Sequence, residues 1–200
     1  MLAGVNGAGK SSLGGVAFQA SGAEFFNPDV AAARLREQQP ALSAEQANGL
    51  AWTLGRRGLE RALADGLTYA FETTLGGNSI ARLLLDGARN GAEVHVWFAG
   101  LATPELHLKR IAARVAAGGH DIPETKVRER FDASRSNLVK LMLHLASLRV
   151  YDNSVEADPR AGRKPQPVLL LQMQAGRVVT HAPLRTVPAW AKPLLAAALR

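Results

Sequence analysis

The sequence predicts an α/β fold, a three-layer sandwich around a mainly parallel sheet of about five strands. Short apolar segments typical of strands alternate with longer segments whose apolar residues recur at helical intervals. A glycine-rich turn follows the first strand signal and precedes a helical one. The 200 residues are enough for one such domain with a small appendage.

Strand signals come from β-branched and aromatic residues in segments that end at turn-forming residues. The clearest segment is 93–101, in which Val94, Val96 and Phe98 alternate and so share one face. The predicted parallel strands are residues 1–5, 23–27, 67–72, 93–101 and 149–153.

Helix signals come from caps and breakers at the ends of segments with helical periodicity. Ser43 and Gln46 have the spacing of a capping box, and Gly91 stands where a glycine ends a helix. Asp121 and Glu124 are candidate caps of a further helix. The predicted helices are residues 11–20, 30–38, 79–90 and 188–200, with others that begin near Ser43, Thr103 and Asp121.

The composition changes at residues 156–167, a polar segment with three prolines. This change favours a core of residues 1–155 and a C-terminal part of residues 156–200. In the C-terminal part, segments 168–174 and 177–181 are predicted to form a hairpin, with the last helix packed on the core.

Composition excludes several classes of protein. The absence of cysteine rules out a disulfide framework and a thiolate metal site. No apolar run approaches the roughly 18 residues that span a bilayer. The first residues do not have the basic-then-apolar order of a signal peptide, because polar Asn6 and Lys10 interrupt them. These features favour a cytoplasmic protein with no membrane partner. The net charge of +7 permits a nucleic-acid partner, but the basic residues are spread out and aromatics make up only 6%, which disfavours one.

The glycine-rich turn, residues 4–11, matches the Walker A pattern G-x-x-x-x-G-K-[ST]. Glycines let the backbone turn its N–H groups toward phosphate oxygens, and the following helix adds its positive dipole end. Lys10 is expected to reach the β- and γ-phosphates of ATP, and the Ser11 hydroxyl to bind Mg²⁺. The predicted nucleotide-binding residues are Asn6, Gly7, Ala8, Gly9, Lys10, Ser11 and Ser12.

Two carboxylates follow predicted strands, at the edge where open α/β sheets bind ligands. Asp29 is a candidate general base for an acceptor hydroxyl; the alternative is a cap of the 30–38 helix, and the two roles are compatible. Glu72 is a candidate for binding Mg²⁺ through water or for holding the acceptor, and the alternative is a surface charge. No Walker B run is present, so the carboxylate that supports Mg²⁺ stays open.

Six stretches together make the chain resemble the zeta-toxin family of P-loop kinases, in its short single-domain branch. They occur in family order and cover about three-quarters of the chain, whereas the Walker motif alone would indicate only an NTPase. The stretches are GVNGAGKSS at 4–12, FFNPD at 25–29, FETTLGG at 71–77, RIAARVAAGGHDIPE at 110–124, ERFDASRSNL at 129–138 and VYDNS at 150–154.

The resemblance implies a nucleotide-binding core with a mobile basic lid, at about 104–147, and the phosphorylation of a sugar hydroxyl of UDP-N-acetylglucosamine. It implies that Asp29 is the general base and that Glu72, Thr73 and Thr74 belong to the acceptor-binding segment. It also implies that Arg110 or Arg114 lies near the transferring phosphate; Arg130, Arg128 and His120 are candidates for a second contact there. Members that act as toxins imply a neutralising antitoxin.

Elementary chemistry supports a role for some of these arginines, because the charge on a transferring phosphoryl group needs cations beyond Lys10 and Mg²⁺. Arg110 and Arg114 are four residues apart and share a helix face. The glycines at 118–119 are a candidate lid hinge or a helix end. Asn153 carries an amide suited to the edge of adenine; the alternative is a turn-forming residue.

The leading hypothesis is therefore an ATP- and Mg²⁺-dependent kinase of a small polar acceptor, with a nucleotide-sugar such as UDP-N-acetylglucosamine as the expected class. Two alternatives stay open. One is a kinase of nucleic-acid ends, which the net charge favours. The other is a nucleotide-switched ATPase that acts through a binding partner.

Overall fold

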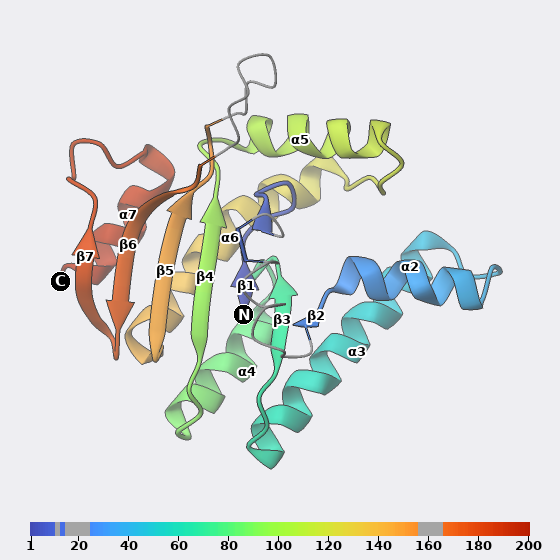
Figure 1. The fold of residues 1–200 in the computed structure, drawn as a ribbon, viewed down its shortest axis with the longest axis horizontal. Coiled ribbons are helices and arrows are strands. Elements are labelled where there is room, and N and C mark those ends of the chain that lie inside the picture. The colour runs from blue at the N-terminus through green and yellow to red at the C-terminus, as the bar shows by residue number, and fades with distance from the viewer. Residues whose placement is uncertain (11–12, 15–24, 156–165) are drawn as a thin grey trace.

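The computed structural model describes residues 1–10, 13–14, 25–155 and 166–200. A seven-stranded sheet forms its centre, with the strand order β2-β3-β1-β4-β5-β6-β7 (Figure 1). The strands are β1 Leu2–Ala3, β2 Phe25–Phe26, β3 Ala70–Thr73, β4 His95–Gly100, β5 Ser147–Asp152, β6 Val168–Gln174 and β7 Arg177–His181.

The first five strands in sequence are parallel, as the alternation of strand and helix signals predicts. β1 lies between β3 and β4, with Leu2 opposite both Glu72 and Trp97. Because the strands are parallel, their carboxyl ends meet at one edge of the sheet. The segment after β1 and the ends of β2, β3 and β5 therefore converge there.

The predicted hairpin is confirmed residue for residue, and it extends the sheet. β6 pairs antiparallel with β5, and β7 pairs antiparallel with β6. Ala175 and Gly176 both have positive φ angles, 48° and 72°, as a two-residue hairpin turn with the right-handed strand twist requires. The strand expected at 149–153 begins two residues earlier, at Ser147, because His95 and Val96 of β4 pair with Ser147 and Leu148.

Several helix ends follow the local chemistry that predicted them. Ser43 and Gln46 form both hydrogen bonds of a capping box at the start of α3, and Thr103 accepts from the backbone of Leu106 at the start of α5. The helices are α2 Pro28–Gln38, α3 Ala44–Asp65, α4 Asn78–Arg89, α5 Pro104–Ala116, α6 Glu124–Leu141 and α7 Lys192–Ala198, with 3₁₀ turns at Met142–His144 and Ala189–Ala191.

Two candidate caps, Asp121 and Asp29, do not cap the helices predicted to follow them. Asp121 does not cap α6: its carboxylate accepts from the backbone of Ile122, and Pro123 occupies the cap position without a side-chain hydrogen bond. Asp29 does not cap α2 either, because the Asn27 side chain accepts from the backbone nitrogens of Asp29 and Val30.

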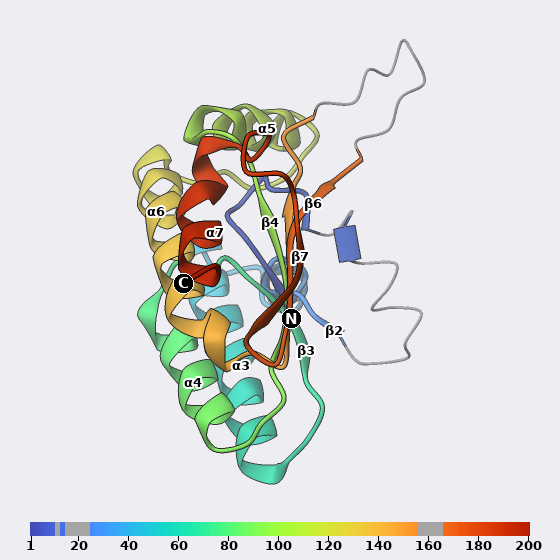
Figure 2. The same ribbon diagram turned by 90° about the vertical axis from the view of Figure 1, so that its left-hand side faces the viewer.

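The layers place the core between the sheet and helices α4, α6 and α7, which cover one face (Figure 2). The indole of Trp190 packs so tightly on β4 that a β-carbon at Gly100 would lie 2.2 Å from it. The α/β class and mainly parallel sheet are thus confirmed. Most of the helix expected at 11–20 lies outside the described residues.

Candidate functional site

The glycine-rich turn after β1 has the backbone of a phosphate cradle. Gly4, Gly7 and Gly9 have φ angles of 136°, 80° and 77°, which side chains rarely adopt. A β-carbon at Gly7 would lie 2.9 Å from the His107 carbonyl oxygen, and one at Gly9 would lie 2.3 Å from Nδ2 of Asn153. The motif therefore needs glycine at these positions for shape as well as for backbone freedom.

Neighbouring elements hold the cradle from outside. The Nδ1 of His107 lies 2.8 Å from the Asn6 carbonyl oxygen, and Nδ2 of Asn153 donates to the Ala8 carbonyl at 2.9 Å. Arg110 in turn donates to the Asn153 carbonyl at 2.8 Å. The structure thus places Arg110 and Asn153 against the nucleotide-binding turn. The proposed contact of Asn153 with adenine stays a prediction.

His107 is a neutral support of the cradle. Burial lowers the pKa of His107 from 6.5 to about 4, and the charges of Lys10 and Arg110 act in the same direction. A carbonyl oxygen can only accept a hydrogen bond, so the proton of the neutral ring is assigned to Nδ1. The sequence alone did not indicate that this histidine supports the turn, because His107 and Asn6 are 101 positions apart.

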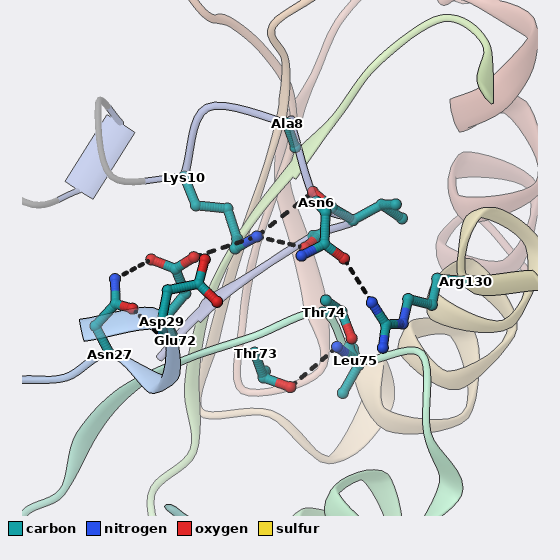
Figure 3. A network of polar contacts seen from close by, with 12 residues as sticks. Asn6, Ala8, Lys10, Asn27, Asp29, Glu72, Thr73, Thr74, Leu75 and Arg130 are labelled. Carbon is teal, nitrogen blue, oxygen red and sulfur yellow. Dashed lines mark hydrogen bonds and ion pairs between the residues drawn. The ribbon is translucent and has the colours of Figure 1, made fainter. Parts of the chain in front are cut away.

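Lys10 and Glu72 connect the cradle to the end of β3. The Lys10 ammonium donates to the Gly4 carbonyl at 2.8 Å and lies 3.3 Å from Oε1 of Glu72. Asn27 donates to the other carboxylate oxygen of Glu72 at 3.2 Å. Figure 3 shows Lys10, Glu72 and Asp29 pointing toward one another. Glu72 is therefore a largely buried, partnered acid, and the surface-charge alternative does not hold.

Asp29 stands in the first turn of α2, where the helix dipole favours a negative charge. Its carboxylate is partly exposed and faces the loop between α5 and α6. Arg114 Nη1 lies 3.8 Å from one oxygen and His120 Nε2 lies 3.7 Å from the other. The structure thus brings together Asp29, Arg114 and His120, three residues that the sequence analysis selected separately.

Arg130 enters the same region from α6. Its Nη1 donates to Oδ1 of Asn6 at 2.8 Å. The aliphatic part of its side chain packs on Gly76, where an added β-carbon would lie 2.6 Å from Cγ of Arg130. Burial lowers the pKa of the Arg130 guanidinium, while the charge of Asp29 opposes this effect. Arg128, two residues earlier, points away to exposed Glu105 and Glu124 (the distances are 2.8 and 2.7 Å) and is not part of the site.

Thr73 and Thr74 shape the loop after β3. Their hydroxyl oxygens accept from the backbone nitrogens of Leu75 and Gly76, at 3.0 and 3.3 Å. Leu75 is fully buried with a φ of 54°, and Asn137 donates to its carbonyl. Each hydroxyl group also has one hydrogen that it can donate, and both threonines line the cavity described below.

These residues surround one cavity of about 240 Å³. Of the residues predicted from sequence, the cavity is lined by Asn6, Lys10, Asp29, Glu72, Thr73, Thr74, His120 and Arg130. Gly7, Ala8, Gly9, Arg110 and Asn153 belong to the adjoining cradle. Ser11 and Ser12 lie outside the described residues.

Sequence analysis missed one wall of the cavity. Asn48, Trp52 and Arg56 of α3 line it, together with Gly55. Asn48, Trp52 and Arg56 follow one another at intervals of four residues, and Gly55 comes three residues after Trp52. This helical spacing places them on one face of α3, and it is the sequence signal that could have identified them. Trp52 is 47% exposed, so the wall offers an indole that the protein core does not cover.

The described part of the chain contains no group of three or more carboxylate, histidine or cysteine side chains that could hold a metal ion. None of its helices is both long and apolar enough to cross a membrane.

Comparisons with known proteins agree with the cradle. A family model described as an AAA domain matches residues 1–141. An uncharacterised protein of Haemophilus influenzae is 33% identical over 129 residues, which is 64% of this chain and 88% of that protein.

Solved structures share the fold at low sequence identity. A chain of the AvrRxo1-ORF1:-ORF2 structure with ATP has a TM-score of 0.65 and 16% identity, over 98% of this chain and 62% of that one. A chain from the PezAT toxin-antitoxin system of Streptococcus pneumoniae has a TM-score of 0.54 and 17% identity, over 94% of this chain and 73% of that one.

The fold and the cradle are those of a P-loop nucleotide-binding domain, and the AvrRxo1 and PezAT chains above share this fold. The chain belongs to the AAA domain family. It spans 62% of the length of the AvrRxo1 chain that it matches.

Proposed function

We propose that this protein transfers the γ-phosphoryl group of ATP to a hydroxyl of a small polar acceptor, a nucleotide-sugar such as UDP-N-acetylglucosamine. One observation carries the proposal: the P-loop lysine, two carboxylates and a guanidinium line a single cavity of about 240 Å³. Lys10 would hold the phosphates of ATP from the cradle side. Asp29 and Glu72 would face the acceptor from the ends of β2 and β3.

Asp29 is the proposed general base. Its carboxylate would take the proton of the acceptor hydroxyl as that oxygen forms a bond to the γ-phosphorus and the bond from phosphorus to the β,γ-bridging oxygen breaks, releasing ADP. The side chain is 43% exposed, so an acceptor can reach it. Glu72 is held between Lys10 and Asn27 and would position the acceptor.

Arg130 and Arg114 are the proposed stabilisers of charge on the transferring group. Arg130 lies on the cavity wall and is fixed by Asn6 of the cradle. Arg114 carries a buried Nε with no hydrogen-bond partner among the described residues, and buried donors are normally satisfied, by a ligand if not by protein. Arg130 would contact phosphate oxygens from the cavity wall, whereas Arg114, which lies beside Asp29 and does not line the cavity, would reach them through a side-chain movement.

A magnesium ion fits this donor set. Mg²⁺ in kinases keeps several waters and uses few protein ligands besides phosphates, so the lack of a three-residue cluster among the described residues is compatible with it. Glu72 could contact the hydrated ion, and Ser11 stays the predicted direct ligand. When bound, the ion neutralises charge on the phosphates.

The acceptor class rests on the zeta-toxin resemblance, which assigns Asp29, Glu72, Thr73 and Thr74 to the acceptor. These four residues line the cavity.

A protein partner is also proposed from similarity to other proteins. PezAT is a toxin-antitoxin system, and AvrRxo1-ORF1 was crystallised with ORF2. We propose that an antitoxin-like protein covers the nucleotide site of this chain.

The test is transfer of label from γ-labelled ATP to a metabolite extract and to UDP-N-acetylglucosamine. Native protein should label an acceptor. Lys10→Ala should lose both label transfer and nucleotide binding, whereas Asp29→Asn should lose transfer and keep nucleotide binding nearly intact. The matched control is Asp65→Asn, an exposed carboxylate at the end of α3, which should transfer label at the native rate. Full-rate transfer by Asp29→Asn would remove Asp29 from the mechanism.

A further inference from the structure

The α3 wall of the cavity, formed by Asn48, Trp52 and Arg56, is placed by close packing behind it. A β-carbon at Gly55 would lie 2.6 Å from the Phe26 ring, and one at Gly58 would lie 2.7 Å from the Tyr69 hydroxyl. The Tyr69 hydroxyl also donates to the Gly55 carbonyl at 3.3 Å. These two glycines let α3 approach the aromatic residues of β2 and the segment before β3 closely. The helix face that meets the cavity is therefore fixed relative to Lys10 and Glu72.

The exposed indole on this wall is paired with a cation. The Arg56 guanidinium carbon lies 5.8 Å from the centre of the Trp52 ring, within the range of a cation–π contact. Glu60 accepts from Nε of Arg56 at 2.9 Å and lies 2.8 Å from Nη2, which orients the guanidinium. An arginine has five N–H donors in a planar fork, so these contacts leave donors for a phosphate.

The walls of the cavity have different chemistry. The wall with Lys10 is charged and suits phosphates and a reacting hydroxyl. The α3 wall offers a flat aromatic face, the amide of Asn48 and a guanidinium. Aromatic rings stack on nucleobases of any identity, and an amide can both donate to and accept from a base edge.

We infer that the Asn48–Trp52–Arg56 face binds the nucleotide part of the acceptor, with a base stacked on Trp52 and a phosphate beside Arg56. This inference rests on the proposed function, because it assigns the remote part of the same acceptor. It makes Trp52 a specificity residue: Trp52 contacts the acceptor far from the reacting hydroxyl, so its loss should raise KM and change kcat little.

Binding can be measured without phosphoryl transfer. With the ATP site saturated by a non-hydrolysable ATP analogue, UMP, AMP, UDP-N-acetylglucosamine and N-acetylglucosamine 1-phosphate are titrated while tryptophan fluorescence is recorded. Of the three tryptophans, Trp190 is buried and Trp97 packs against Arg149 and Tyr151 outside the cavity lining, so the half-exposed Trp52 should report a stacked base. At least one nucleotide and the nucleotide-sugar should quench the emission, and the sugar phosphate should not.

Three variants distinguish a loss of stacking on Trp52 from a nonspecific effect of substitutions in α3 on nucleotide binding. Trp52→Ala should weaken nucleotide binding about tenfold, as loss of one base–aromatic stack predicts. Trp52→Phe should retain most of the affinity but lose the quenching. Leu54→Ala removes a comparably exposed side chain of α3 (48%) that does not line the cavity, and it should bind like the native protein.

Two results would overturn the inference: unchanged nucleotide affinity in Trp52→Ala, or equal binding of the sugar phosphate and the nucleotides. Label transfer to an acceptor by a protein that gives either result would leave the proposed function standing. Conversely, nucleotide binding at Trp52 in a protein that transfers no label would refute the kinase proposal alone.

Discussion

The ammonium group of Lys10 lies 3.3 Å from a carboxylate oxygen of Glu72, and both side chains are largely withdrawn from solvent, with exposed fractions of 7% and 12%. The contact joins the turn after β1 to the end of β3, its neighbour in the sheet. The nucleotide side and the acceptor side of the cavity are thus coupled through one ion pair.

Glu72→Gln should lower the free energy of unfolding by about 1.5–3 kcal/mol, because the buried ammonium loses a charged partner. Urea unfolding measures this change. Label transfer should fall at the same time, since Glu72 is proposed to position the acceptor. Glu93→Gln, at an 83% exposed carboxylate near the start of β4, should change neither quantity. Equal stability of Glu72→Gln and native protein would show that the pair contributes nothing net.

Gly9→Ala should abolish ATP binding, measured by calorimetry, because its β-carbon would lie 2.3 Å from Nδ2 of Asn153 at a φ of 77°. Gly66→Ala is the matched control. Its φ is also positive, 66°, but open space surrounds the added carbon, so only backbone strain of about 1–2 kcal/mol is expected. ATP binding should survive in Gly66→Ala. Native-like ATP affinity in Gly9→Ala would contradict the tight fit of Asn153 against the cradle.

Stability should fall as the pH drops from about 6.5 toward 4, because of His107. Its folded pKa of about 4 lies below the unfolded value of 6.5, so the unfolded chain binds the proton first. The contribution of this pKa difference to the free energy of unfolding is fully present above pH 6.5 and amounts to about 3 kcal/mol. Urea unfolding across this range measures it. His107→Asn should flatten the slope, whereas His181→Asn, at an exposed histidine, should keep it.

Arg130→Gln should lower the rate of label transfer by roughly a thousandfold, the scale of losing a cation that stabilises a transferring phosphoryl group. Arg128→Gln provides the control from the same helix. Its guanidinium contacts Glu105 and Glu124 on the exposed surface, where solvent screens both ion pairs, so the substitution should leave the site undisturbed. Comparable rates in the two variants would show that Arg130 does not act on the phosphoryl group.

Elements with local chemical signatures could be predicted from sequence. The hairpin strands Val168–Gln174 and Arg177–His181 have the predicted bounds, and the Ser43–Gln46 capping box forms both of its bonds. The Walker motif predicted the cradle because its glycines act through their own backbone.

Contacts between distant segments could not be predicted in this way. Asn27 was read only as part of a motif, yet it caps α2 and also binds Glu72, 45 residues away. The aromatic wall at Trp52 depends on how closely Gly55 lets α3 pack on Phe26, which is a tertiary distance that the sequence does not encode locally.

The cationic wall and the aromatic wall of the cavity are formed by different segments of the chain. Lys10 and Arg130 come from the turn after β1 and from α6, whereas Trp52 and Arg56 lie on α3, near the outer edge of the sheet (Figure 1). If α3 binds the acceptor as inferred, substitutions there should change which acceptor is preferred while the residues that hold ATP stay intact. A library randomised at positions 48, 52 and 56 would test this separation directly.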